Sequence, residues 1–143
     1  MNNMQLQLTV GFSLSQISIG HRNALEKLMN EIGLHSGQIS ILNELWDADG
    51  VSQADLVRAL KVSAPAIHKM IQSLSKSNFV QCRKCKKDSR LMRVYLTKKG
   101  RDVRPQVREQ WQKMEEIILR DFSETEKMLF SLLLEKLKKN VAC

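Results

Sequence analysis

The stretch Ser52-Gln-Ala-Asp-Leu-Val-Arg-Ala-Leu-Lys-Val-Ser63 contains two helix starts in close succession. Ser52 stands three residues before Asp55, the spacing at which a serine caps a helix N-terminus and a carboxylate favours its positive end. Ser63 offers a second cap barely a turn after the first helix would end, and Pro65 is tolerated in the first turn that follows. The stretch therefore predicts two short helices joined by a tight turn.

The second of these helices has one apolar and one polar side. Its apolar residues recur with the 3.6-residue period of a helix and are Ile67, Met70, Ile71 and Leu74. The residues left on the outer side are Ala64, Pro65, His68, Lys69, Gln72, Ser73 and Lys76. A helix with such a polar, basic outer side is sized for the DNA major groove.

The periodicity changes after Asn78. Residues 79–83 and 91–96 are rich in β-forming side chains and are separated by the polar run 84–90, so they predict a β-hairpin with a basic tip. Two short helices followed by such a hairpin describe a winged helix-turn-helix.

In these motifs the chain resembles the MarR (multiple antibiotic resistance) family of transcriptional regulators. The residues that carry the resemblance are Val51-Ser52-Gln53, Leu60-Lys-Val-Ser63, Asp88-Ser-Arg90 and Val94-Tyr-Leu-Thr97-Lys-Lys-Gly100. The resemblance extends over roughly residues 10 to 140 and is close in detail only in the central region. The chain departs from the family at Cys82, where an arginine is common; Arg83 is a substitute whose side chain would point to the opposite face.

Two groups of residues are expected to contact DNA. On the recognition helix, Lys69 and His68 can donate to guanine acceptors and Ala66 can contact a thymine methyl group. The expected contacts of this helix are Ser63, Ala64, Pro65, Ala66, His68, Lys69, Gln72, Ser73 and Lys76, the last three toward phosphates. The alternative for His68 is an exposed residue without a contact.

The hairpin supplies the second group. The resemblance implies that Arg90 enters the minor groove, where a groove narrowed by A·T pairs attracts a guanidinium, and that Asp88 shapes the hairpin. Lys84, Lys86 and Lys87 are expected to meet phosphates near the tip, and a merely solvated loop is the alternative for each of them.

The net charge of +8 is concentrated in one segment. Residues 61–104 hold 13 Lys and Arg against 2 Asp, a net +11, whereas the other residues, 10 basic and 13 acidic, carry −3. The segment spans the recognition helix, the hairpin and the start of the next helix, as expected of a phosphate-binding surface. A solvated charged face is the alternative.

Helices are also predicted before the winged helix. Apolar residues at positions 10, 14, 17, 25, 28, 29 and 32 follow the period of a long first helix that stops near Gly33. Residues 38–46 form a second helix, capped by Ser36, that supports the helix-turn-helix from behind.

Two more helices are predicted after the hairpin. Thr97 caps a helix whose apolar stripe runs from Val103 to Ile118. Pro105 interrupts it, so we expect either a kink or a helix whose regular part begins near that residue. Residues 123–126 read as a capping box that opens a last helix with a further apolar face.

The fold class is therefore mainly α with a small β-hairpin: a winged helix-turn-helix with long N- and C-terminal dimerisation helices. We expect residues 1–35 and 98–143 to form the dimerisation helices, as the family resemblance implies, and residues 36–97 to form the DNA-binding lobe. A two-fold dimer would place its recognition helices about 34 Å apart and require a pseudo-palindromic site. A purely intramolecular core is the alternative.

Cys82 and Cys85 form a CxxC motif. A zinc site needs four ligands, and none of the remaining candidates has ligand-like spacing, so no metal is expected; these are His21, His35, His68 and Cys143. Residues three apart in a strand are ~10 Å from one another, too far for a disulfide unless the hairpin bends.

The neighbouring cations, Arg83, Lys84, Lys86 and Lys87, would favour a thiolate at this motif. A thiol switch at Cys82 and Cys85 is therefore one hypothesis, and inert cysteines are the other.

The resemblance further implies that a small aromatic ligand binds between the dimerisation helices and the DNA-binding lobe and weakens DNA binding. Such a crevice could be lined by His21, Arg22, Trp46 and Trp111. The alternative for Trp46 and Trp111 is a plain core position.

These observations predict a homodimeric, sequence-specific DNA-binding regulator that acts as a repressor. Its expected partners are double-stranded DNA and a second copy of the chain, and no cofactor is expected. No enzymatic activity is expected, because the sequence shows no Gly-rich phosphate loop, nucleophile with its base, or metal-ligand cluster. The alternatives are a winged helix used as a protein-interaction module and a CxxC thiol oxidoreductase. Without a secretory signal or an apolar run of the ~20 residues that span a bilayer, we expect a cytoplasmic protein with no membrane partner.

Overall fold

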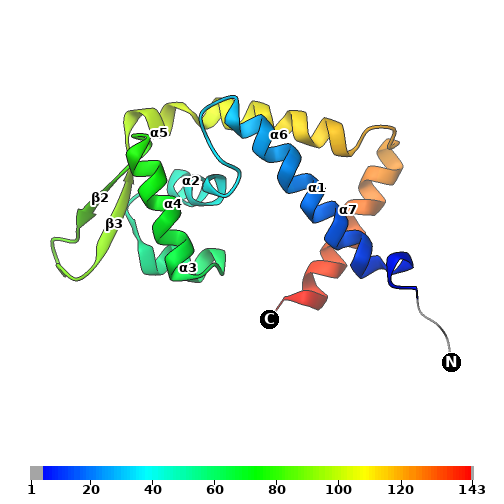
Figure 1. Ribbon diagram of the computed structural model, residues 1–143, viewed down its shortest axis with the longest axis horizontal. Helices are drawn as coiled ribbons and strands as arrows, with labels where there is room; N and C mark the ends of the chain where they lie inside the picture. Colours follow the sequence, from blue (N-terminus) through cyan, green and yellow to red (C-terminus); the bar gives the residue numbers. More distant parts are fainter. Residues whose placement is uncertain (1–4, 143) are drawn as a thin grey trace.

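The computed structural model describes residues 5–142, which form a helical molecule with one small sheet (Figure 1). A 3-10 turn, Leu6–Leu8, precedes the first α-helix. The α-helices are α1 Val10–Asn30, α2 Gln38–Asp47, α3 Gln53–Leu60, α4 Ala64–Lys76, α5 Lys98–Asp102, α6 Arg104–Ile118 and α7 Glu124–Val141. The strands are β1 Val51–Ser52, β2 Val80–Lys84 and β3 Met92–Leu96. The predicted winged helix-turn-helix with long flanking helices is confirmed.

The sheet has three antiparallel strands in the order β1-β3-β2, one more than the sequence predicted. The hairpin β2–β3 pairs Cys82 with Val94 and Arg83 with Arg93. The missed strand β1 has only two residues and pairs Val51 with Val94. So short a strand has no periodicity of its own, and only its neighbour β3 defines it.

The buried core joins the helix-turn-helix to the sheet and to the ends of two flanking helices. It includes Ile41 and Leu42 of α2, Leu56 of α3 and Val94 of β3, all at most 1% exposed. Gly100 closes the packing beneath the sheet, since a Cβ there would lie 2.1 Å from the carbonyl oxygen of Phe79. The Trp46 indole N–H donates to the Gly100 carbonyl at 2.9 Å and ties α2 to α5.

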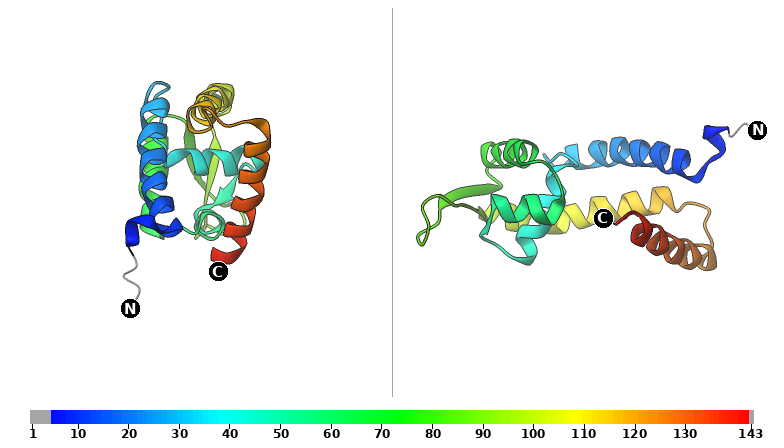
Figure 2. Two further views of the ribbon diagram at one scale, coloured as in Figure 1. Left: turned by 90° about the vertical axis from the view of Figure 1, so that its right-hand side faces the viewer. Right: turned by 90° about the horizontal axis from the view of Figure 1, so that it is seen from below.

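α1 and α6 run away from this core side by side, whereas α7 turns back from the end of α6 and lies apart from α1 (Figures 1 and 2). Buried Gln110 of α6 joins the pair, because its Nε2 donates to the Leu28 carbonyl at 2.6 Å and to Glu31 Oε2 at 2.8 Å. The helix-turn-helix and the sheet thus lie at one end of the molecule, and the start of α1 and the turn between α6 and α7 lie at the other (Figure 1).

Most predicted helix boundaries are confirmed. Ser52 and Ser123 each belong to a complete capping box, and the Ser63 and Thr97 side chains each accept a backbone N–H. Pro105 lies in the first turn of α6, where its missing N–H costs no helical hydrogen bond.

The predicted cap of the second helix is wrong. Gly37 occupies the N-cap of α2, and Ser36 instead donates its backbone N–H to Glu26 Oε2 at 2.7 Å. Glu26 also accepts from His35 Nδ1 at 2.6 Å, and these two hydrogen bonds lower the pKa of the carboxyl group. The N-cap of α2 is therefore one position later than predicted, and Ser36 contacts α1 through Glu26.

Large apolar side chains are exposed on α1, α6 and α7. Ile17 is 62% exposed and Leu133 is 48% exposed, and α7 buries none of its residues. The exposed set on the two longest helices comprises Val10, Phe12, Leu14, Ile17, Ile19, Met128, Leu129, Phe130, Leu132, Leu133 and Val141. No helix within residues 5–142 has the length and hydropathy needed to span a bilayer.

Candidate nucleic-acid interface

The α3–α4 turn positions the recognition helix. α3 ends at Leu60, and the left-handed backbone of its C-cap Lys61, with φ of 53°, turns the chain so that Ser63 can cap α4 two residues later. The Ser63 hydroxyl accepts the N–H of Ala66 at 3.3 Å, and the Ile67 N–H bonds to the Ser63 carbonyl. The start of α4 is therefore fixed by local contacts that leave its outer side free.

α4 presents its predicted polar side to solvent. Ile67, Ile71 and Leu74 are at most 2% exposed, which anchors the helix on the core. The outward side chains of the predicted set are Ser63, Ala64, Pro65, His68, Lys69, Gln72 and Lys76, and Ala66 is half-buried beside them. This surface has hydrogen-bond donors, a cationic group and an apolar edge, the chemistry used to read base edges.

Ser73 does not lie on this outer surface, contrary to prediction. It is half-buried, and its hydroxyl accepts Gln38 Nε2 of α2 at 2.9 Å. Ser75, which the sequence reasoning left out, is exposed instead and lines a groove with His68 and Gln72. His68, Gln72 and Ser75 have the spacing of one helical face, so the helical period could have predicted that Ser75 lies on this surface.

The hairpin extends beyond the helical lobe as a wing (Figure 1). At its tip Asp88 Oδ1 accepts both the backbone N–H of Arg90, at 3.0 Å, and its Nε, at 3.1 Å. These bonds hold the pKa of Asp88 below its ordinary value. The Arg90 side chain is 88% exposed, and the other predicted tip cations, Lys84, Lys86 and Lys87, are also exposed. The wing thus presents exposed cations around a turn that Asp88 shapes.

A groove of about 550 Å³ separates the recognition helix from the wing. His68, Gln72 and Lys76 line it from α4, while Cys82 and Met92 line it from the wing and Gln53 from the start of α3. Predicted contacts of α4 therefore share one open groove with Cys82 and Met92 of the wing, whereas the predicted contacts at the wing tip lie outside its lining.

The two cysteines of the hairpin have opposite environments. Burial raises the pKa of the Cys82 thiol. The pKa of Cys85 is lowered to about 7, first by a hydrogen bond from Arg93 and then by the backbone N–H groups of Asp88 and Lys87. Both thiols are free; Cys143 lies outside the described residues.

The cation that favours the Cys85 thiolate is Arg93, which the sequence reasoning did not name. Arg93 Nε lies 3.5 Å from Cys85 Sγ across the hairpin. Arg83, one of the cations predicted for this role, lies instead over the Tyr95 ring at 4.9 Å. The contact joins residues eight apart in sequence, so it follows from the strand register, which the sequence did not define.

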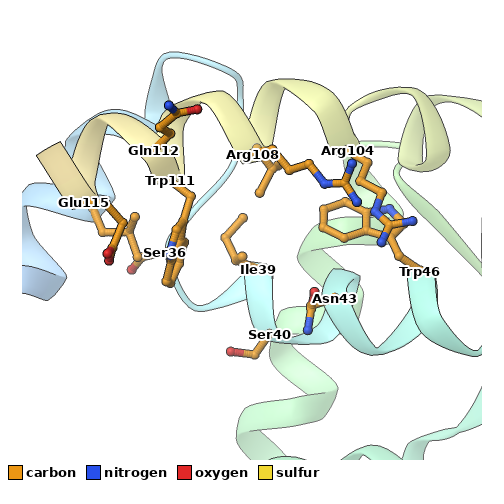
Figure 3. A pocket seen from close by; sticks show the side chains of 12 residues that line it. Ser36, Ile39, Ser40, Asn43, Trp46, Arg104, Arg108, Trp111, Gln112 and Glu115 are labelled. Atoms are coloured by element: carbon orange, nitrogen blue, oxygen red, sulfur yellow. The ribbon is translucent and has the colours of Figure 1, made fainter. Parts of the chain in front are cut away.

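A second cavity, of about 640 Å³, lies between α2 and α6 (Figure 3). Trp46 and Trp111 lie toward opposite ends of it, Ile39 lies between them, and Arg104 and Arg108 reach in from α6. The Arg104 guanidinium lies 5.6 Å from the centroid of the Trp46 ring. Aromatic walls with two cations suit a small aromatic anion.

Only part of the predicted crevice set lines this cavity. Trp46 is half-buried and Trp111 is 39% exposed, so neither is a fully buried core residue. His21 packs edge-on against Trp111 with ring centroids 6.1 Å apart, behind the lining, and Arg22 is exposed on α1 away from it. Within residues 5–142 no cluster of His, Cys, Asp or Glu could hold a metal ion.

Comparisons with known proteins agree with this geometry. The family model described as "Transcriptional regulator SarA/Rot" matches residues 23–106. The HTH-type transcriptional regulator YwoH of Bacillus subtilis (strain 168) is 31% identical over 103 residues, 72% of this chain and 74% of that protein.

Among solved structures, a MarR protein from Peptoclostridium difficile is 26% identical with a TM-score of 0.84, covering 99% of this chain and 91% of that one. A MarR-family regulator from Listeria monocytogenes, solved with a 26-mer DNA, has a TM-score of 0.79 at 22% identity and covers 97% of this chain and 91% of that one.

Proposed function

Since this chain belongs to the SarA/Rot family of transcriptional regulators and has the MarR-type winged-helix fold, we propose that it is a repressor that binds a pseudo-palindromic operator as a homodimer. In this proposal α4 reads bases in the major groove and Arg90 of the wing enters the adjacent minor groove. The Listeria relative, which was solved with DNA, supports the assignment of DNA as the partner.

The observation that carries the proposal is the groove between the outer side of α4 and the wing, set in a strongly basic segment. His68 and Lys76 line the groove from α4, Lys84, Lys86 and Lys87 are exposed on the wing, and the surrounding segment 61–104 carries a net +11. A polyanion is attracted where exposed cations outnumber acidic groups in this way. A winged helix used only to bind another protein would not need this concentration of charge.

The homodimer is supported by the apolar surface at the far end of the molecule. The exposed apolar side chains of α1 and α7 are too numerous and too large to be left in water, and a second copy of the chain would cover them symmetrically. We assign residues 1–35 and 98–143 to this dimerisation region and residues 36–97 to the DNA-binding lobe. The two-fold axis would then set the spacing of the operator half-sites.

Regulation by a small aromatic anion is supported by the cavity between α2 and α6. α6 belongs to the proposed dimerisation region, whereas α2 supports the recognition helix. A ligand between these helices would therefore alter the angle between the dimerisation region and the DNA-binding lobe. Benzoate should quench tryptophan fluorescence and weaken operator binding, whereas neutral benzyl alcohol should do neither. Equal effects of the two compounds would contradict an anion site at Arg104 and Arg108.

The decisive test of the proposed function compares the operator affinity of the wild type with that of Arg90→Ala. Fluorescence anisotropy of labelled operator DNA measures the affinity at increasing salt concentrations. Arg90→Ala should lose about 1–3 kcal/mol of binding free energy, roughly 5- to 150-fold in affinity. Arg120→Ala is the matched control, because it removes the same charge from an exposed residue beyond α6, outside the interface. Equal affinity for operator and random DNA, or no effect of Arg90→Ala, would refute the proposed role.

A further inference from the structure

Arg93 connects three separate segments of the DNA-binding lobe. From the second position of β3, its Nη1 donates to the Gly50 carbonyl oxygen at 2.8 Å, while its Nε donates to Cys85 Sγ at 3.5 Å. Gly50 lies in the turn before the helix-turn-helix, and Cys85 lies at the start of the wing tip. One guanidinium therefore spans from the wing tip to the turn that leads into α3.

The Gly50 end of this connection is firmly held. The Gly50 N–H donates to the Val94 carbonyl at 3.0 Å, and Asp49 Oδ1 accepts the Leu96 N–H at 2.9 Å. Gly50 has a φ of 76°, and a Cβ there would lie 2.7 Å from the Tyr95 ring. The turn is thus fixed on β3 two residues before Ser52, the cap of α3. A change in the contacts of Arg93 must therefore begin at Cys85.

The Cys85 end is chemically reactive. An anionic sulfur is stabilised there by the guanidinium and by the backbone N–H groups of Lys87 and Asp88, which lower the thiol pKa to about 7. Cys82, three residues earlier, is partly buried in the groove, and burial raises its pKa. Of the two thiols, only Cys85 therefore has a large thiolate population near neutral pH.

We propose that Cys85 is a modification site at which a low-molecular-weight disulfide forms a mixed disulfide, and that this modification frees the wing tip from Arg93, which joins the tip to the turn before the helix-turn-helix. The effect on regulation rests on the proposed DNA-binding function. The chemical step itself does not.

The reaction is a thiol–disulfide exchange. The Cys85 thiolate attacks one sulfur of the small disulfide, the old S–S bond breaks, a new one forms to Cys85, and the displaced sulfur leaves as a small thiolate. Charge and electrons balance without any further oxidant. An internal Cys82–Cys85 disulfide is disfavoured, because β2 is extended through Lys84 and residues three apart in a strand are ~10 Å from each other.

Modification removes the negative charge that holds the Arg93 guanidinium and places a bulky group between Arg93 and the turn formed by residues 85–88. The tip then keeps its Asp88–Arg90 contacts but loses its contact with Arg93, through which it is joined to the Gly50 turn. Arg90 would reach the minor groove from a less defined position. We expect operator affinity to fall at least tenfold.

The chemical step is tested with 5,5′-dithiobis(2-nitrobenzoate) on proteins with a single cysteine. Cys82→Ser/Cys143→Ser retains Cys85, and Cys85→Ser/Cys143→Ser retains Cys82. At pH 7 the Cys85 protein should react about fivefold faster than a small-molecule thiol of pKa near 9, the net of a larger thiolate fraction and a weaker nucleophile. The Cys82 protein should react more slowly than that thiol.

The role of Arg93 is tested in the Cys85 protein by Arg93→Met, which keeps a long side chain without donors. Its reaction rate at pH 7 should fall, and the midpoint of the rate–pH curve should move from about 7 toward that of an ordinary thiol. Arg83→Met is the matched control, since Arg83 faces Arg93 in the strand register but lies over Tyr95. An unchanged midpoint in Arg93→Met, or an equal shift in both variants, overturns the assignment.

The regulatory consequence is tested by operator binding of the Cys85 protein before and after exchange with oxidised glutathione or with cystamine. Both adducts should weaken binding, and dithiothreitol should restore it; the Cys82 protein should not respond. Loss with anionic glutathione alone would mean simple repulsion and overturn the release of Arg93. Failure of the unmodified protein to bind operator would refute the proposed function and leave the thiol kinetics interpretable.

Discussion

α4 and α7 are both amphipathic helices with serine caps, yet they have opposite fates in the folded chain. α4 buries Ile67, Ile71 and Leu74 against the core, whereas the longer α7 buries no residue at all. Hydrophobic periodicity shows which side of a helix avoids water but not what covers that side. The difference marks α4 as part of a lobe with its own core and α7 as part of the surface that the proposed dimer would cover.

The largest effect is expected in the lobe. Ile67→Ala removes a side chain with no exposure and leaves a cavity beneath the recognition helix, so the free energy of unfolding should fall by about 2–5 kcal/mol. Urea unfolding followed by circular dichroism measures this. The matched change in α7, Leu133→Ala, should cost far less when protein is dilute enough to be monomeric. Equal losses would show that α7 is covered within its own chain.

A smaller effect is expected from a charge in the apolar surface of α7. Leu133→Glu should raise the dimer dissociation constant at least tenfold, because it would bury an unpaired carboxylate between two copies. Sedimentation equilibrium measures the constant. Ser131→Glu adds the same charge two positions earlier, roughly on the opposite side of the helix, and should leave the constant nearly unchanged. A monomeric wild type would contradict the assigned interface.

The smallest effect tests the feature that the two regions share. Ser52→Ala and Ser123→Ala each remove a side chain that accepts a backbone N–H in a capping box, and each should cost about 1 kcal/mol. The loss at Ser52 should appear in the unfolding of the lobe. The loss at Ser123 should appear as weaker dimerisation, measured over a range of protein concentrations. A reversed pattern would remove the distinction between the two regions.

The ionisation of Cys85 should make the stability of the DNA-binding lobe, but not that of α7, depend on pH. Its folded pKa, about 7, lies below the ordinary value of 9.0, so the contact with Arg93 contributes stability above pH 9 and loses it as pH falls through 7. The effect should be confined to the DNA-binding lobe, and hydrogen exchange in β3 should detect it. Cys85→Ser should remove this dependence. If the pH dependence persisted in Cys85→Ser, a different ionisable group would be responsible for it.

Local chemistry explains which predictions from sequence succeeded. The caps at Ser52, Ser63, Thr97 and Ser123 need only atoms within one turn of helix, and the period of α4 needs only its own side chains. The cap assigned to Ser36 is wrong by one position, because α2 begins after Gly37 and Ser36 contacts Glu26 of α1. The outward position predicted for Ser73 is wrong because its hydroxyl accepts from Gln38, which lies far away in sequence.

By itself, the sequence determined the order of helices and hairpin, their capped starts, and the concentration of positive charge from residue 61 to 104. The tertiary structure alone decided that β1 joins the sheet, that Arg93 rather than the neighbouring lysines meets Cys85, and that α7 remains uncovered. The physical reason is range: capping and amphipathicity act over three or four residues, whereas these three outcomes depend on strand register and on packing between distant segments.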